Sequence, residues 1–235
     1  MIYIILALLG LMIGSFASAI TYRIPRGQQF IKGRSFCDSC KKELMWYDNI
    51  PLFSFLFYHG VTRCCSKKIS IRYPLIELTS AFGIVVLYLV FGFSFLLATY
   101  YILLILTMSI FIIDLEHQII PDELTWFILI LGLIANSQQL MTGLFAGFFL
   151  SSLLLALYLV TGGRGMGLGD VKLAIPIGLL LGFEKGLVWI MTTFIVGGIF
   201  ATVLLLFKRV NLKTKIAFGP FMLIAFWMIV FFGQH

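Results

Sequence analysis

The sequence predicts an all-α polytopic membrane protein with about eight transmembrane helices and a small cytoplasmic insert between the first two. Hydrophobic residues make up 61% of the 235 residues, whereas charged residues make up only 11%. The mean hydropathy is +1.06, and a soluble domain would carry about a quarter charged residues. These values exclude an ordinary soluble enzyme, a disordered chain and a nucleic-acid-binding protein. The lipid bilayer is therefore the expected surroundings of most of the chain.

The first expected span covers residues 1–22. Ala17-Ser18-Ala19 has the small-residue pattern of a signal-peptide cleavage site, but a signal peptide carries basic residues before its apolar stretch. Here the first basic residue is Arg23, after the stretch, which predicts an uncleaved helix with its N-terminus outside. The other spans are expected near residues 75–91, 94–113, 123–137, 142–160, 170–182, 186–207 and 216–232.

Basic residues are concentrated on one side of this arrangement. Residues 23–73 form a polar insert that holds ten of the 17 lysines and arginines, and residues 74–235 form the membrane core. Eight spans place the insert and the loops at 114–122, 161–169 and 208–215 on the same side. The only basic residue on the opposite side is Lys185. The basic side is therefore expected to be cytoplasmic, with both termini outside. Anionic lipid head groups explain the basicity without a nucleic-acid partner.

Two aspartates are expected at the same membrane boundary. Asp114 follows the apolar run 101–113, and Asp170 opens a short apolar segment. An ionisable group at membrane depth is a functional candidate. Two neighbouring carboxylates favour one protonated and one ionised form. Such a pair can activate a water molecule and protonate a departing amine, as peptide-bond hydrolysis requires. The pattern therefore predicts a hydrolytic site.

Simpler interpretations of these residues stay open. Asp170 is also suited to be a helix N-cap. Asp122 is interpreted as a plain cap, and Glu116 and His117 as solvated loop residues. The alternating Gly165, Gly167 and Gly169 permit positive φ and close approach to an extended peptide. A dinucleotide-binding loop would need a βαβ unit, which the surrounding sequence does not provide.

All four cysteines lie in the insert. Cys37 and Cys40 form a C-x-x-C pair, and Cys64 and Cys65 are adjacent. In a reducing cytosol a metal site is favoured over a disulfide, and a structural zinc ion takes four ligands in a tetrahedron. A small insert with little core would gain stability from such a site. Because adjacent cysteines are an unusual second half, free or partly paired thiols remain the alternative.

The order of several motifs resembles the type IV prepilin leader peptidases, many of which are also N-methyltransferases. The resemblance covers nearly the whole chain. The motifs are Gly14-Ser15-Phe16, Tyr22-Arg23-Ile24-Pro25, the pair beginning at Cys37, Asp48-Asn49-Ile50-Pro51, Ile69-Ser70 through Glu77, Ile113-Asp114 through Asp122, and Gly167-Leu168-Gly169-Asp170-Val171-Lys172. The last matches the G-x-G-D motif of intramembrane aspartyl proteases.

The resemblance implies a bacterial inner-membrane enzyme whose substrates are the precursors of type IV pilins or pseudopilins. It would cut after a glycine at the cytoplasmic edge of the precursor's apolar helix and remove a short basic leader. S-adenosylmethionine would then methylate the new N-terminal residue. Asp114 and Asp170 would be the catalytic pair, with the general base not assigned. Gly167, Gly169 and Lys172 would support the substrate or its loop.

Two positions depart from the family pattern. Alignment on Ile69-Ser70 puts Thr62 where the family has the first cysteine of a second C-x-x-C pair. Cys64 would then be the substitute fourth ligand, or the zinc site is incomplete. Ser18 stands where the family often has Asn. Because relatives without the insert lack methylation, its presence here favours a bifunctional enzyme. The residues do not place the methyl-donor pocket.

Two other classes of function predict different features. An ion-coupled transporter would carry its carboxylates near the bilayer midplane, with broken helices from internal repeats. No repeat is visible in this sequence. A non-catalytic scaffold would tolerate replacement of both aspartates, so an assay of leader removal separates it from a peptidase.

Overall fold

The computed structural model describes residues 1–29, 36–37, 40, 42–43, 45, 50, 52–163, 165–207 and 216–233. Within these residues the secondary structure is helical, with two isolated β-bridges and no strand. The predicted all-α class is therefore confirmed. The chain divides into two compact units, Met1–Ser109 and Ile110–His235.

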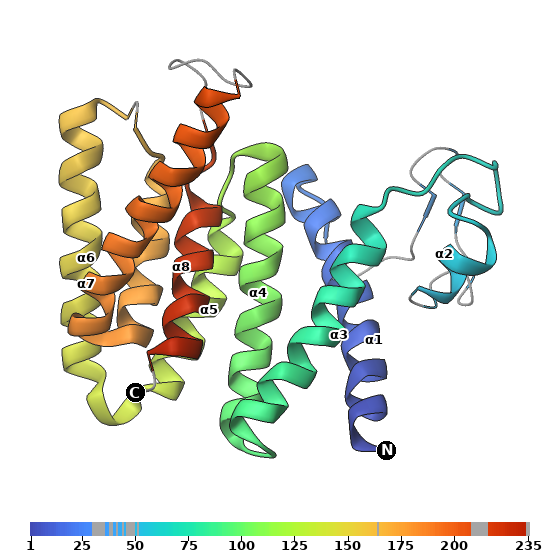
Figure 1. The fold of residues 1–235 in the computed structure, drawn as a ribbon, viewed down its shortest axis with the longest axis horizontal. Helices are drawn as coiled ribbons and strands as arrows, with labels where there is room; N and C mark the ends of the chain where they lie inside the picture. Colours follow the sequence, from blue (N-terminus) through green and yellow to red (C-terminus); the bar gives the residue numbers. More distant parts are fainter. Residues whose placement is uncertain are drawn as a thin grey trace. The chain divides into compact units, whose positions relative to one another are not determined.

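The first unit is built on two long helices, α1 (Ile2–Arg23) and α3 (Arg72–Phe91), which lie side by side (Figure 1). Small residues bring their backbones together: a methyl group on Gly10 would lie 2.5 Å from the Ala81 Cα atom. The Ser80 hydroxyl donates to the Gly10 carbonyl at 2.7 Å. Close helix packing through small residues is typical of membrane proteins. The unit also holds the 3₁₀ turn η1 (Ile24–Arg26), the short helix α2 (Phe53–Phe57) and most of α4 (Phe95–His117).

The second unit begins within α4 and contains four further helices (Figure 1). They are α5 (Asp122–Ala135), α6 (Leu140–Thr161), α7 (Leu168–Leu206) and α8 (Gly219–Phe232), with the 3₁₀ turn η3 (Ser137–Gln139) before α6. Gly147 and Gly178 let α6 and α7 pack closely, since a methyl group on Gly178 would lie 2.6 Å from the Gly147 Cα atom. Trp189 is fully buried and donates to the Met222 carbonyl at 2.8 Å, which ties α7 to α8.

Helix α7 reverses direction at Gly182. This glycine has φ 74° and ψ −176°, a conformation that only glycine adopts without strain. Asp170 and Ala201 line one pocket, although about 45 Å would separate them along an uninterrupted helix. The reversal produces the two segments expected at 170–182 and 186–207. The gap that these two expected spans leave at 183–185 is wrong, because the turn lies at Gly182 and the second helical segment begins immediately after it.

Among the described residues, five helices are long and apolar enough to cross a bilayer: α1, α3, α4, α6 and α7. Helices α5 and α8 have 14 residues each, or about 21 Å, less than the roughly 30 Å of a hydrocarbon core. Large apolar side chains such as Phe82, Trp126 and Met191 are exposed, as expected for surfaces that face lipid. The protein is therefore a membrane protein.

Candidate functional site

Asp114 lies in the last turn of α4, where the sequence places the end of a long apolar run. Its side chain is 5% exposed. The helix ends three residues later at His117, and the next residue, Gln118, has φ 54°. The Gly219 backbone N–H interacts favourably with the Asp114 carboxylate. The Oδ2 atom of Asp114 is buried and has no hydrogen-bond partner among the described residues. An unpaired buried carboxylate oxygen is costly, so it is suited to bind water or substrate.

Asp170 lies in the first turn of α7 and is also 5% exposed. The alternative interpretation of Asp170 as the N-cap of this helix is wrong. Gly167 occupies that position with φ −90° and ψ 159°, and Asp170 follows three residues later. The Gly167 N–H donates to Asp170 Oδ2 at 2.8 Å. This bond fixes the carboxylate at the start of the helix, where the helix dipole favours negative charge.

The two aspartates line the same pocket of about 790 Å³ in the second unit. Asp114 is close enough to Asp170 for a direct electrostatic interaction. The Ile120 side chain packs against Gly169, beside Asp170, and against Gly219, beside Asp114. A methyl group on Gly169 would lie 3.0 Å from Ile120 Cβ, and one on Gly219 would lie 3.3 Å from Ile120 Cδ1. Segments far apart in the sequence thus hold two buried carboxylates at one pocket, where they can share a proton.

The glycine-rich loop before α7 differs from its expected conformation. Positive φ occurs at Gly162 and Gly163, whereas Gly165, Gly167 and Gly169 are not among the described residues with positive φ. Gly169 is needed for its close approach to Ile120. Gly167 contributes to the loop through its backbone N–H, which donates a hydrogen bond to Asp170.

Lys172 has a partner that sequence reasoning missed. Its Nζ atom lies 2.9 Å and 3.0 Å from the two carboxylate oxygens of Asp122. The interpretation of Asp122 as a plain cap is wrong, since Pro121 is the N-cap of α5 and no side chain caps this helix. Asp122 and Lys172 both line the aspartate pocket, and both are more than half exposed. Glu116 and His117 are exposed and are not among the residues that line it.

Two residues that the sequence did not single out lie close to the aspartates: Ile120, which lines the pocket, and Gly219, which lies against Asp114. Both act through contacts with residues distant in the chain, so neither has a local signature. The Gly-Pro pair at 219–220 marks a helix start, but it does not reveal that Asp114 lies against it. Arg164 and the basic loop at 208–215, which the sequence placed on the aspartate side, lie outside the described residues.

The four cysteines form a compact cluster in the first unit. A backbone hydrogen bond lies beside each pair: the Cys37 N–H donates to the Lys42 carbonyl at 2.9 Å, and the Thr62 N–H donates to the Lys67 carbonyl at 2.7 Å. The Sγ atoms of Cys40 and Cys64 are 3.1 Å apart. All four Sγ atoms lie within 4.8 Å of one another, so the cluster can hold a metal ion.

The distance between Cys37 and Cys65 fits a tetrahedral thiolate site. A Zn–S bond of about 2.3 Å implies sulfur atoms about 3.8 Å apart, and the Cys37 and Cys65 Sγ atoms are 3.7 Å apart. Thr62 at the family's cysteine position does not leave the cluster with three thiols, because the Cys64 thiol lies beside that of Cys40. The Thr62 hydroxyl lies 3.1 Å from Cys65 Sγ. The hydrogen bond with Cys40 raises the pKa of Cys64 to about 12. The Thr62 hydroxyl lowers the pKa of Cys65.

Comparisons with known proteins cover both units. Residues 8–91 match the bacterial peptidase A24 N-terminal domain, and residues 100–202 match the type IV leader peptidase family. The cysteines fall in the first match and both aspartates in the second. No solved structure matches the chain significantly.

Several relatives named prepilin leader peptidase/N-methyltransferase align over almost the whole chain. The relative from Stutzerimonas stutzeri is 32% identical over 97% of this chain and 89% of its own length. The relative from Neisseria gonorrhoeae is 34% identical over 95% and 88%, respectively. The relative from Vibrio cholerae is 33% identical over 99% and 97%, respectively. The chain therefore belongs to the type IV leader peptidase family.

Proposed function

We propose that the protein is a bifunctional membrane enzyme: an aspartyl endopeptidase that removes the basic leader from type IV prepilins or pseudopilins, and an N-methyltransferase that modifies the new N-terminus. The relatives carry both activities in their names. The observation that carries the peptidase assignment is the pair of buried aspartates at one pocket. The cut falls after a glycine at the cytoplasmic end of the precursor's apolar helix.

Asp114 and Asp170 are the proposed catalytic residues. One carboxylate accepts a proton from water as the water oxygen attacks the scissile carbonyl carbon, and the partner carboxylic acid protonates the carbonyl oxygen. Cleavage of the C–N bond then releases the amine of the mature pilin, which takes up a proton from the pair. Asp114 Oδ2, which has no hydrogen-bond partner among the residues that the structure describes, is a suitable contact for this water. Because coupled carboxylates titrate jointly, the roles belong to the pair.

The glycines and Lys172 keep supporting roles in this proposal. Gly167 holds Asp170 through its backbone N–H, and Gly169 allows α7 to approach Ile120. Lys172, paired with Asp122 at the same pocket, contributes to the polar lining that meets the leader.

Cys37, Cys40, Cys64 and Cys65 are the proposed ligands of a structural zinc ion. The support is the convergence of their Sγ atoms and the distance between Cys37 and Cys65, which fits a tetrahedral site. Such an ion would join the turns at Cys37–Cys40 and Cys64–Cys65, and so stabilise an insert that has little core.

Purified wild-type protein is expected to contain about one zinc ion per chain, as measured by mass spectrometry of its metal content. Replacing any one of the four cysteines by Ser should reduce bound zinc, because a three-thiolate site binds more weakly. Thr62→Ser, which retains the hydroxyl beside Cys65, is the control and should keep the metal. Absence of zinc from the wild type would contradict the site. Retention by Cys64→Ser alone would remove Cys64 from the ligand set.

The proposed topology has eight spans: α1, α3, α4, α5, α6, the two segments of α7 on either side of Gly182, and α8. Both termini lie outside and the aspartate pocket faces the cytoplasm of a bacterial inner membrane. The proposed organisation is a first span at 1–22, a methylation-linked insert at 23–73 and a peptidase core at 74–235. Basic residues at the cytoplasmic ends of the first helices support this orientation, among them Arg23, Arg26 and Arg72.

A transporter function is not favoured. It would require carboxylates near the middle of the membrane, whereas Asp114 lies in the last turn of α4 and Asp170 in the first turn of α7. Helix ends are the expected position for residues that meet a substrate at the membrane surface.

The two proposed activities are tested together by co-expressing the wild-type protein with a prepilin and measuring the mass of the pilin N-terminus. The expected product lacks the leader and carries one added methyl group. An intact leader would contradict the peptidase assignment. A cleaved but unmodified N-terminus, with S-adenosylmethionine supplied, would contradict only the methyltransferase assignment.

A further inference from the structure

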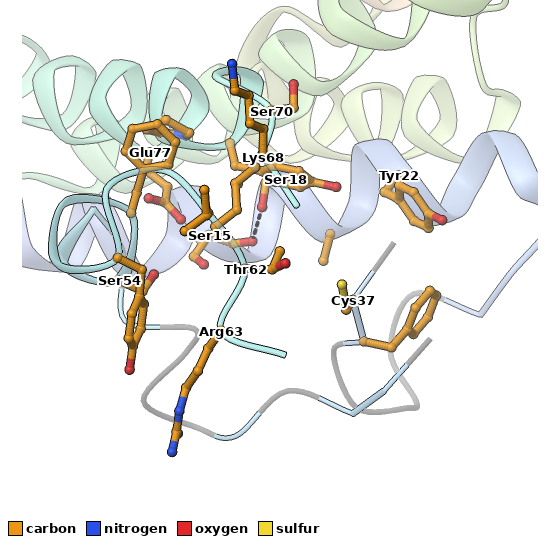
Figure 2. A pocket seen from close by; sticks show the side chains of 18 of the residues that line it. Ser15, Ser18, Tyr22, Cys37, Ser54, Thr62, Arg63, Lys68, Ser70 and Glu77 are labelled. Atoms are coloured by element: carbon orange, nitrogen blue, oxygen red, sulfur yellow. Dashed lines mark hydrogen bonds between the residues drawn. The ribbon is translucent and has the colours of Figure 1, made fainter. Parts of the chain in front are cut away.

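A second pocket lies in the first unit, separate from the two aspartates. It has a volume of about 210 Å³ and is lined by α1, by the insert and by the start of α3. Figure 2 shows side chains from all three parts around it, including Ser15, Ser18, Ser54 and Glu77. Cys37 of the cysteine cluster also lines it. The pocket therefore depends on the folded insert.

Glu77 is the distinctive residue of this pocket, which we call the Glu77 pocket. This carboxylic acid belongs to α3, a candidate transmembrane helix, and its side chain is only 7% exposed. The Leu52 N–H donates to its Oε2 atom at 2.8 Å, and the Ser15 hydroxyl interacts with the carboxylate. Among the described residues, no ion pair joins Glu77 to a lysine or arginine. A buried carboxylate without a cationic partner is costly, so Glu77 is suited to a ligand that supplies a positive charge.

The backbone that holds Glu77 is strained. Leu52 has φ 57° and ψ −40°, which is unusual for a residue with a branched side chain. Strain of this kind persists where the surrounding structure enforces it, often at binding sites. Here the strained residue positions the N–H group that orients the Glu77 carboxylate.

The rest of the lining suits a ligand with several kinds of polar and aromatic group. Lys68 lines the pocket and can meet a carboxylate. Tyr22 and Phe36 make an edge-to-face pair with ring centroids 6.0 Å apart, and both line the pocket. Aromatic walls of this type accept a planar heterocycle. Several serine hydroxyls can bind the hydroxyls of a sugar.

S-adenosylmethionine combines these groups: a sulfonium cation, an α-amino acid, a ribose and an adenine. We propose that the Glu77 pocket binds S-adenosylmethionine, with the Glu77 carboxylate facing the cationic sulfonium. This inference rests on the proposed methyltransferase function and names the site of its methyl donor. When bound, S-adenosylmethionine supplies the methyl group. The protein's own contribution is to orient the donor through Glu77 and the serines and to hold its adenine against aromatic side chains.

The test is equilibrium binding of radiolabelled S-adenosylmethionine to the full-length protein in lipid nanodiscs. Glu77→Gln keeps the size of the side chain but removes its charge, and should weaken binding by about tenfold or more. Ser54→Phe should weaken it similarly by filling the pocket. Glu184→Gln, an exposed change in the second unit outside both pockets, should bind as the wild type does. Both pocket variants should still remove the leader, which shows that their peptidase unit is folded.

A second ligand distinguishes the contact with the sulfonium from general damage to the pocket. S-adenosylhomocysteine lacks the cationic sulfur, so Glu77→Gln should weaken its binding much less, whereas Ser54→Phe should weaken both ligands. Wild-type affinity for S-adenosylmethionine in both pocket variants would overturn the inference and leave the proposed function intact. Equal weakening of both ligands in Glu77→Gln would overturn the contact with the sulfonium. Absence of S-adenosylmethionine binding by the wild type would overturn the methyltransferase assignment itself.

Discussion

Asp114→Asn and Asp170→Asn are each expected to slow leader removal by about a thousandfold or more. Asparagine keeps the size of the aspartate side chain but can neither accept a proton from water nor hold one for donation to the substrate. The measurement is single-turnover cleavage of a purified prepilin by purified enzyme in lipid. Both variants should remain inserted in the membrane, because the substitution replaces a buried ionisable group by a neutral one of similar shape.

Glu116→Gln is the matched control for these two variants. Glu116 lies two residues after Asp114 but is exposed and is not among the residues that line the aspartate pocket. Its removal should change the cleavage rate by no more than about threefold, as for other exposed charges. Normal cleavage by either aspartate variant would show that the pair is not catalytic.

Gly219→Ala is expected to slow leader removal by about a hundredfold, although it adds only a methyl group. That group would lie 2.6 Å from Asp114 Oδ2, so the carboxylate must move. The helix itself can remain, because the clash is with the end of a side chain rather than with backbone. A displacement of about 1 Å at a catalytic group can cost about a hundredfold in rate.

Gly198→Ala tests whether adding a methyl group to the aspartate pocket has this effect by itself. Gly198 lines the aspartate pocket, and beyond its own helix backbone no atom of the described residues lies within 4 Å of the position of an added Cβ. Its cleavage rate should fall far less than that of Gly219→Ala, when both are measured by single turnover at equal amounts of folded protein. Equal losses in the two variants would mean that filling the pocket, rather than moving Asp114, is responsible.

The two proposed activities depend on residues in different compact units. The cysteine cluster and the Glu77 pocket belong to Met1–Ser109, and the aspartate pair belongs to Ile110–His235. We therefore expect the aspartate variants to retain S-adenosylmethionine binding and the Glu77 variant to retain leader removal. The two chemistries can be disabled one at a time.

The sequence predicted well those features that the bilayer imposes locally. A lipid-exposed chain must satisfy its backbone hydrogen bonds within a helix, so apolar stretches identify helices directly. The stretch expected at 75–91 forms α3 (Arg72–Phe91), and the one at 142–160 forms α6 (Leu140–Thr161). The positions of Asp114 and Asp170 at helix ends followed from the same boundaries between apolar and polar sequence.

Features that depend on contacts between distant segments were not predictable in this way. The contact between Gly219 and Asp114 joins residues 105 positions apart. The pairing of Asp122 with Lys172 was missed because Asp122 was interpreted as a cap and Lys172 as a support for the substrate or its loop. The Glu77 pocket also requires three separate segments, and its position was not predicted. The sequence also did not show how the adjacent Cys64 and Cys65 could both reach the other cysteines. The turn at Thr62–Lys67 places both thiols beside them.

Whether Asp114 and Asp170 work as one pair is tested most directly by comparing the two single Asn variants with the double variant in single-turnover leader removal. If the carboxylates share one proton and one water, the first substitution already abolishes their joint function. The double variant should then cleave within about threefold of either single variant. Losses that multiply, so that the double variant is slower than each single variant by about the full effect of the other substitution, would show that the two residues act independently and would contradict the shared-proton mechanism.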